Sequence, residues 1–183
     1  MGIEVSQMIS ALKGDIARPN RFRCEFNVPT FLQQTLGDQT TVSVLIRATS
    51  LPESILDEVD VHFLGRVIPF AGDTKIPDWK ITVLNDANFT YFKLFSEWQD
   101  GINSIISNTS IITKLQDYTT DCRIYFLSRD VDNPNILLRK LFNIWPINIS
   151  PIQLSAESAN ADSTFDVTFK IVGGIDRVNN DVT

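Results

Sequence analysis

The sequence predicts a mainly β, antiparallel fold, a β-sandwich or half-barrel, with one flanking α-helix. Apolar and polar residues alternate with period two in several separate segments, as they do in strands with one buried face. Turn-forming residues separate these segments. Between residues 87 and 100, aromatic residues instead recur at spacing three, which indicates a helix. Many strands and one clear helix together favour this class over a bundle or an α/β fold.

The composition indicates one globular domain over residues 1–183. Apolar residues make up 43% of the 183 positions and charged residues 21%, which are ordinary proportions for a chain that buries a core. No apolar run approaches the roughly 20 residues that span a bilayer, so we expect no stable membrane association. The first six residues lack the pattern of a signal peptide.

The N-terminal part begins with an expected short amphipathic helix over residues 3–13, on which Ile3, Met8, Ile9 and Leu12 share a face. The alternative is a loosely held terminus. The first strand follows from Arg21, with alternation that Pro29 ends. A turn is expected at 37–39, and the alternation resumes over 42–46.

The segment from Pro52 to Gly72 reads as a hairpin or a long excursion. Its acidic start leads to alternation over 59–63, a tight turn at Gly65 and an apolar run over 67–70. The alternation over 78–83 predicts another half-buried strand.

The predicted helix over 87–100 carries Phe89, Phe92, Phe95 and Trp98 on one stripe. Asn85 or Asp86 can cap its first turn, and Gly101 is expected to end it. The simplest role for this stripe is to face the core.

The C-terminal part starts with an expected loop over 103–114 and a strand over 122–126. The pattern does not decide whether 136–145 is a strand or a helix. Residues 164–172 give the clearest strand of the chain. Further expected features are a turn-rich connector at 128–134, a strand over 147–154 broken by Pro151, a turn at 160–163 and a polar tail at 179–183. The whole chain thus predicts seven or eight strands, one clear helix and one further helix.

No combination of residues points to catalysis, a cofactor or a bound metal. The single histidine, His62, lies on the polar face of a predicted strand, and no Gly-x-Ser-x-Gly motif accompanies it. Residues 130–133 resemble the start of a calcium loop, but Asn135 and Leu141 stand where that loop needs glycine and glutamate. We expect two buried free thiols at Cys24 and Cys122, with one disulfide as the alternative. The net charge of −6 argues against a sequence-reading nucleic-acid binder.

Several segments, in this order and at these separations, resemble the tail tube proteins of T-even-like contractile-tailed bacteriophages. The likeness is densest between Ala48 and Trp98, and residues 103–115 and 129–140 are individual to this chain. The segments that carry it are Asp15–Phe22, Ser50–Ser54, Phe63–Arg66, Pro69–Asp73, Asp78–Asp86, Phe95–Gln99, Trp145–Asn148 and Phe165–Phe169.

The resemblance implies a structural virion protein rather than an enzyme. In that family six copies form a ring whose inner strands join into one continuous β-barrel. Rings stack into a tube inside a contractile sheath, and DNA leaves the head through it. The implied partners are further copies of the chain, the tail sheath protein, the baseplate proteins that initiate the tube and the tape measure protein in the lumen. DNA would be a transient partner without sequence specificity. The implied location is the virion tail, assembled in the bacterial host cytoplasm.

Three sets of surface residues follow from this resemblance. The segment 52–72 corresponds to a projecting hairpin that contacts the neighbouring ring, and the helix 87–100 corresponds to an outer helix. The expected inter-ring residues are Leu51, Ile55, Leu56, Phe63, Leu64, Val67, Ile68 and Phe70; the candidate lumen residues are Asp78, Lys80, Thr82, Asp166, Thr168 and Lys170; the candidate sheath-facing residues are Lys93, Glu97 and Asp100.

Two alternatives stay open from the sequence. One is a tube subunit of a phage-derived contractile injection system, or a baseplate tube initiator. The other is a monomeric ligand-binding β-sandwich that uses Trp79, Trp98 and Trp145 as platforms, which requires exposed tryptophans.

Overall fold

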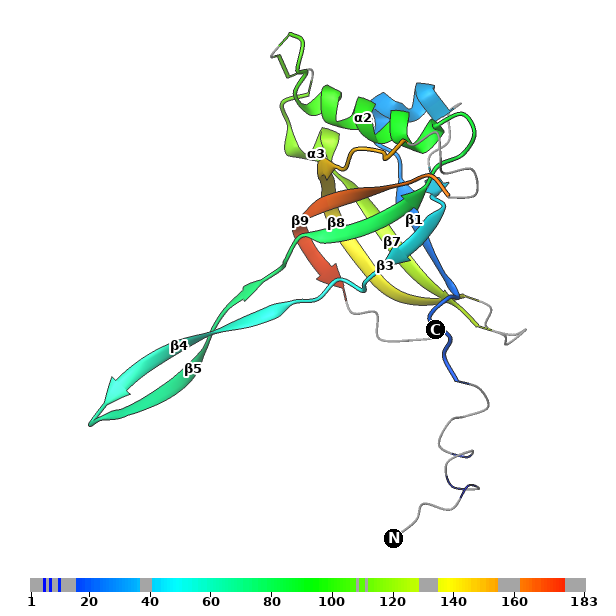
Figure 1. Cartoon of the computed structure of the whole chain (residues 1–183). Coiled ribbons are helices and arrows are strands. Elements are labelled where there is room, and N and C mark those ends of the chain that lie inside the picture. The colour runs from blue at the N-terminus through cyan, green and yellow to red at the C-terminus, as the bar shows by residue number, and fades with distance from the viewer. Residues whose placement is uncertain are drawn as a thin grey trace.

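The computed structural model describes residues 5, 7, 10, 16–36, 41–107, 109–110, 112–128, 135–154 and 162–176 (Figure 1). The predicted helix over 3–13 lies almost entirely outside these residues, as do the turn at 37–39, most of the turn at 160–163, the connector at 129–134 and the tail. The described elements are β1 (Phe22–Asn27), η1 (Thr30–Leu36), β2 (Thr41–Ser43), β3 (Ile46–Thr49), β4 (Ile55–Phe63), β5 (Arg66–Lys75), β6 (Trp79–Leu84), α2 (Thr90–Ile102), α3 (Leu115–Tyr118), β7 (Thr120–Leu127), β8 (Asn135–Ile149) and β9 (Thr164–Asp176).

Seven strands form one antiparallel sheet in the order β2-β1-β7-β8-β9-β6-β3, and β4 and β5 form a separate two-stranded sheet. The end strands β2 and β3 are consecutive in the chain, with only Val44 and Leu45 between them. The sheet therefore curls round on itself into a barrel (Figure 1). The expectation of a mainly β, half-barrel fold with one flanking helix is confirmed.

The alternation in the sequence corresponds to the inside and outside of this barrel. Along β6, Trp79, Ile81 and Val83 are buried, and the residues between them are exposed or half-buried. The same pattern holds along β9, whose Phe165 pairs with Val83. Period two therefore located these strands correctly. The alternation predicted over 42–46, in contrast, is divided between β2 and β3, because the chain bends there from one sheet end to the other.

The segment whose structure the sequence did not decide, 136–145, belongs to β8, which is 15 residues long. Irregular pairings interrupt its alternation, one between Phe142 and Ile144 and one between Pro146 and Asn148. Asn143 has a left-handed backbone (φ 52°), and Gly174 on β9 has φ 106°. Gly173 leaves room for this irregularity, since a Cβ there would lie 2.7 Å from the Asn143 side-chain nitrogen. These shifts explain why no single period fits the segment.

The main helix begins and ends later than predicted. Asp86 does cap it, because its carboxylate accepts hydrogen bonds from the Thr90 backbone N–H (2.6 Å) and hydroxyl (2.7 Å). However, residues 87–88 form a turn and Phe89 is left-handed (φ 54°), so the helix starts at Thr90. Gly101 lies inside the helix and does not end it. A Cβ at Gly101 would lie 2.5 Å from the Phe31 ring, so the glycine permits close contact with η1.

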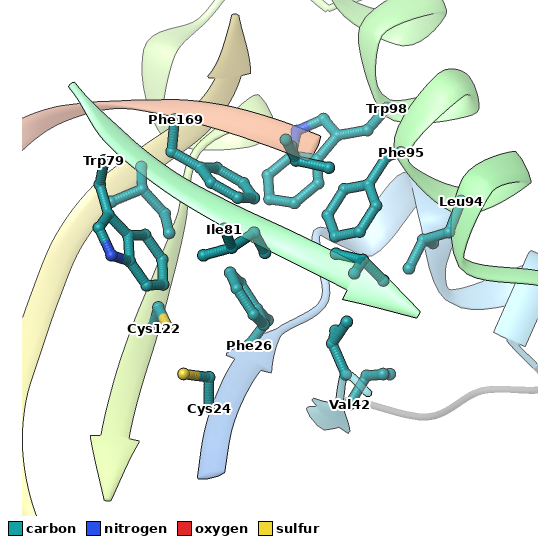
Figure 2. Packing of buried hydrophobic residues seen from close by; sticks show 14 of the residues in the cluster. Cys24, Phe26, Val42, Trp79, Ile81, Leu94, Phe95, Trp98, Cys122 and Phe169 are labelled. Atoms are coloured by element: carbon teal, nitrogen blue, oxygen red, sulfur yellow. The ribbon is translucent and has the colours of Figure 1, made fainter. Parts of the chain in front are cut away.

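The core lies inside the barrel, where α2 covers one end of it. Leu94, Phe95 and Trp98 reach from α2 toward the strands (Figure 2). Phe169 stands at the centre of an aromatic cluster, with ring centroids 5.5 Å from Phe26 and 5.6 Å from Trp79. The predicted helical stripe is thus a core-facing one. Cys24 and Cys122 are buried free thiols in the same core, as expected.

The sequence did not predict η1, which contributes buried Leu32 to the core. The region 103–114 contains no helix or strand among its described residues, as expected for a loop, and α3 follows it directly.

Candidate assembly surfaces

The most prominent surface is the β4–β5 hairpin, which extends away from the barrel (Figure 1). Its two strands contact mainly each other. The turn between them consists of Leu64 and Gly65, both with positive φ (48° and 75°). A two-residue hairpin turn with this geometry matches the twist of the strands, and glycine supplies one of the positive φ angles without strain. A tight two-residue turn therefore joins the two strands, as the sequence predicted at Gly65.

The register of the hairpin separates its side chains onto two faces. Val59 pairs with Phe70, Val61 with Ile68, and Phe63 with Arg66. Because directly paired residues of an antiparallel ladder point to the same side, five apolar side chains gather on one face. We name this the apolar hairpin face: Val59, Val61, Phe63, Ile68 and Phe70. All five are exposed, with Phe63 at 61% and Phe70 at 55% of full exposure.

The opposite hairpin face is mixed, with Glu58, Asp60 and His62 paired to Ala71, Pro69 and Val67. Of the expected inter-ring residues, Phe63, Ile68 and Phe70 thus belong to the apolar hairpin face. Val67 lies on the opposite face. Leu64 is at the tip, and Ile55 and Leu56 lie near the base beyond an irregular pairing. Leu51 precedes the hairpin. All eight are exposed. Val59 and Val61 were absent from the expected set, although their alternation with Asp60 and His62 is visible in the sequence.

The base of the hairpin is fixed to the barrel. The Trp79 indole N–H donates to the Ser50 backbone carbonyl at 2.8 Å. Lys75 on β5 pairs with Asp57 on β4. These bonds join the outgoing and returning chains where they leave the barrel.

A second surface lies on the outside of strands β6 and β9. In their register, Lys80 pairs with Thr168 and Thr82 with Asp166. All six candidate lumen residues therefore lie together on the side opposite the buried residues of these strands. We name this set the paired face: Asp78, Lys80, Thr82, Asp166, Thr168 and Lys170.

The charges of the paired face are joined across the strands. Lys80 lies 2.8 Å from Asp166, and Lys170 lies 2.7 Å from Asp78. The Thr82 hydroxyl donates to Asp166 at 2.7 Å. The hydrogen bond from Lys80, followed by that from Thr82, lowers the pKa of the Asp166 carboxyl because both stabilise its ionised form. Asp166 is therefore ionised at neutral pH.

The third surface is the outer side of α2. Lys93, Glu97 and Asp100 are all exposed and follow the helical spacing of one face. Leu94, Phe95 and Trp98 occupy the buried side. The structure thus places the candidate sheath-facing residues together on the solvent side of the helix.

None of these surfaces resembles an active site. His62 is exposed on the hairpin. Within the described residues, no group of three or more His, Cys, Asp or Glu side chains could hold a metal ion. Of the three tryptophans proposed as ligand platforms, Trp79 and Trp98 are buried and Trp145 is half-buried, so they do not form the exposed set that a monomeric binding domain would need. Among the described helices, none has the length and apolar character that crossing a membrane requires.

The sequence matches a protein-family model described as phage tail tube protein over residues 17–172. The chain is 31% identical to tail tube protein gp19 of Enterobacteria phage T4 over 158 residues, which covers 86% of this chain and 90% of that protein. It is 28% identical to the tail tube protein of Serratia phage KSP90, over 83% of this chain and 84% of that protein.

Solved structures share the fold. A chain of the anti-feeding prophage baseplate aligns with a TM-score of 0.60 at 10% identity, over 92% of this chain and 99% of that one. A chain of the PVC sheath–tube complex, from an extracellular contractile injection system, aligns with a TM-score of 0.59 at 12% identity, over 97% and 100% of the two chains. The match across residues 17–172 and the identity to the T4 protein show that this chain belongs to the phage tail tube protein family.

Proposed function

We propose that this protein forms the inner tube of a contractile phage tail, as hexameric rings stacked into a pipe through which DNA passes to the host. Its role is structural and not enzymatic. It works in the virion after assembly in the host cytoplasm. The sixfold arrangement draws support from the shared fold with a chain of a baseplate structure that was averaged with sixfold symmetry.

The observation that carries this proposal is the apolar hairpin face. Fully burying one Val, Ile or Phe side chain contributes about 1.5–3 kcal/mol, and five such side chains project here on two strands that contact mainly each other. A two-stranded ribbon cannot bury its own face. A copy in the next ring would cover it, so residues 52–72 act as the inter-ring element, together with the rest of β5 to Lys75.

The paired face is our candidate for the tube wall. If each of six copies gives four strands to a common barrel, about 24 strands at about 4.8 Å spacing and about 40° tilt enclose a backbone circle about 48 Å across. Side chains reduce the opening to about 38 Å, which is wider than a DNA duplex needs. Joining end strands between copies would also cover the open edges of β2 and β3.

The remaining partners follow from position. The outer side of α2, with Lys93, Glu97 and Asp100, faces away from the barrel and is our candidate contact for the tail sheath protein. The baseplate proteins that initiate the tube would meet the first ring, and the tape measure protein would occupy the lumen before DNA does. A neighbouring solved structure is itself a sheath–tube complex, which supports a sheath partner.

A second candidate is a tube subunit or tube initiator of a phage-derived injection system. The fold shared with the anti-feeding prophage and PVC chains favours it. The identity to those chains is 10–12%, against 31% to the phage T4 protein, so the phage tail has the stronger support.

The test replaces Phe63 and Phe70 by serine on the apolar hairpin face. We expect the variant to fold, because these side chains do not contribute to the barrel core. We also expect that it no longer forms long tubes, as seen by negative-stain electron microscopy. The matched control is Asp60→Ser with His62→Ser, which alters two side chains of the opposite hairpin face. Normal tubes from the Phe63→Ser, Phe70→Ser protein would contradict the inter-ring assignment.

A further inference from the structure

We propose that Asp78 and Asp166 act as charge masks, which hold the ammonium groups of Lys170 and Lys80 in cross-strand ion pairs so that the tube wall does not retain DNA. This rests on the proposed function in one respect, namely that the paired face lines the lumen. The acidic net charge of the chain alone does not explain release, because a lysine free to reach a phosphate would bind it whatever the total charge.

The geometry of the paired face carries this inference. Both lysines stand on the outside of neighbouring strands. Lys80 on β6 lies 2.8 Å from Asp166 on β9, and Lys170 on β9 lies 2.7 Å from Asp78, the residue just before β6. Thr82 donates to the same Asp166 carboxylate and so fixes its position. Each ammonium group therefore has a partner built into the register of β6 and β9.

The arrangement is repeated elsewhere in the described strands. All four lysines of the nine strands pair with an aspartate on or next to the adjoining strand: Lys75 with Asp57, Lys80 with Asp166, Lys140 with Asp121 at 3.8 Å, and Lys170 with Asp78. Exposed ion pairs stabilise a fold very little. Lys75 and Lys140 lie outside the paired face, so the proposed effect on DNA concerns only the pairs of Lys80 and Lys170.

The consequence would be large in an assembled tube. A ring of six copies would carry about a dozen such lysines around the DNA. Each phosphate contact that releases a counterion strengthens binding, and contacts along a duplex add up. Masked lysines would let DNA slide, whereas unmasked lysines would hold it.

The experiment uses Asp78→Asn combined with Asp166→Asn. The asparagine at 166 can still accept the Thr82 hydrogen bond, so the change removes charge with little change in shape. Tubes are assembled with a labelled short DNA duplex, washed, collected by sedimentation and treated with nuclease. At 50 mM salt we expect the variant to retain about tenfold more duplex than the wild type, and this excess to disappear at high salt.

Two controls separate unmasking from a general loss of acidity. Asp117→Asn with Asp176→Asn also removes two exposed carboxylates, but from α3 and from the last residue of β9, outside the paired face, and should retain no more DNA than the wild type. Adding Lys80→Gln and Lys170→Gln to the test variant should abolish the retention.

The outcomes distinguish the two proposals. Retained duplex that is protected from nuclease supports both the mask and the lumen assignment. Retained duplex that nuclease removes supports the mask and contradicts the lumen assignment. Retention equal to that of the Asp117→Asn, Asp176→Asn control overturns the mask.

If the test variant does not form tubes, the unassembled proteins are compared on a heparin column, which presents a polyanion. We expect the test variant to elute at a higher salt concentration than the control of equal net charge. Identical elution of the two would overturn the mask in this arm.

Discussion

The barrel and the hairpin are both built from strands of alternating apolar and polar residues, but in the isolated chain only the barrel buries its apolar residues. In the barrel, the alternating apolar residues of β6 and β9 are buried, with Val83, Val167 and Phe169 at 0% exposure. In the hairpin, the alternating apolar residues of β4 and β5 stand in solvent. Alternation therefore identifies a face that needs covering, but it does not say whether the cover comes from the same molecule. A subunit made for assembly contains both cases.

The largest expected difference between the two regions is the rate at which their thiols react with a reagent from solvent. Burial raises the pKa of the Cys24 thiol to about 12 and that of Cys122 well above its usual value, so neither provides thiolate for reaction in the folded barrel. A cysteine introduced by Phe63→Cys should react with a thiol reagent at once, and the two native thiols at least about a thousandfold more slowly, since they need the barrel to open. Mass spectrometry of each labelled site measures this. Equal rates in denaturant are the control, and equal rates in native buffer would show that the barrel core is open.

The same aromatic deletion should have unequal effects on stability in the two regions. Phe169→Ala removes the centre of the aromatic cluster and should lower the free energy of unfolding by about 3–5 kcal/mol. Phe70→Ala should change it by less than about 0.5 kcal/mol in the unassembled protein. Urea unfolding measures both. A large loss from Phe70→Ala would mean that the hairpin packs on its own barrel in solution.

Within the barrel, the contact between α2 and η1 can be tested at Gly101. Gly101→Ala should lower the free energy of unfolding by about 1–3 kcal/mol, because the new methyl group overlaps the Phe31 ring, although alanine favours helix. Adding Phe31→Leu should restore part of the loss. Asp100→Ala, one residue away on the exposed side, is the control and should have almost no effect. A stabilised Gly101→Ala protein would show that Phe31 moves aside freely.

The smallest expected effect concerns the outside of the barrel. The pKa of Asp166 is lower in the folded protein than its ordinary value of 3.8, so its contribution to stability is complete above that pH and is lost as the pH falls through the lowered value. Asp166→Asn should reduce the free energy of unfolding at pH 7 by less than about 1 kcal/mol, since the pair with Lys80 is partly exposed. Urea midpoints of the two proteins should converge once the pH has fallen below the lowered pKa of Asp166. A difference that persists there would come from packing and not from charge.

Much of the barrel could be predicted because period two and period three are local signals. β1, β6, β9 and the hairpin were visible in this way. The bend at Val44–Leu45 was not, because closure of the sheet sets it. Gly101 looked like a helix end because its contact with Phe31, 70 positions earlier, leaves no trace nearby.

The candidate surfaces show the same division. Alternation placed Lys80 and Thr82 on one side of a strand, and Asp166 and Lys170 on one side of another. That Lys80 meets Asp166 and Lys170 meets Asp78 depends on the register between β6 and β9. A single sequence does not contain that register, so the ion pairs could not be derived from it.

The hairpin has a mechanical consequence that follows from how it is attached. β3 leads into β4, β5 returns into β6, and β3 pairs with β6, so the hairpin and the β3–β6 pair of the barrel are two stretches of one long antiparallel ribbon. The hydrogen bond from the Trp79 indole to the Ser50 carbonyl joins the two chains of this ribbon where the hairpin leaves the barrel. A force applied at the hairpin turn, at Leu64 and Gly65, would therefore be transmitted along the ribbon to β6, the strand that carries Lys80. Trp79→Phe should widen the distribution of distances between one spin label at the hairpin turn and another on the barrel. An unchanged distribution would show that this hydrogen bond does not restrict the motion of the hairpin.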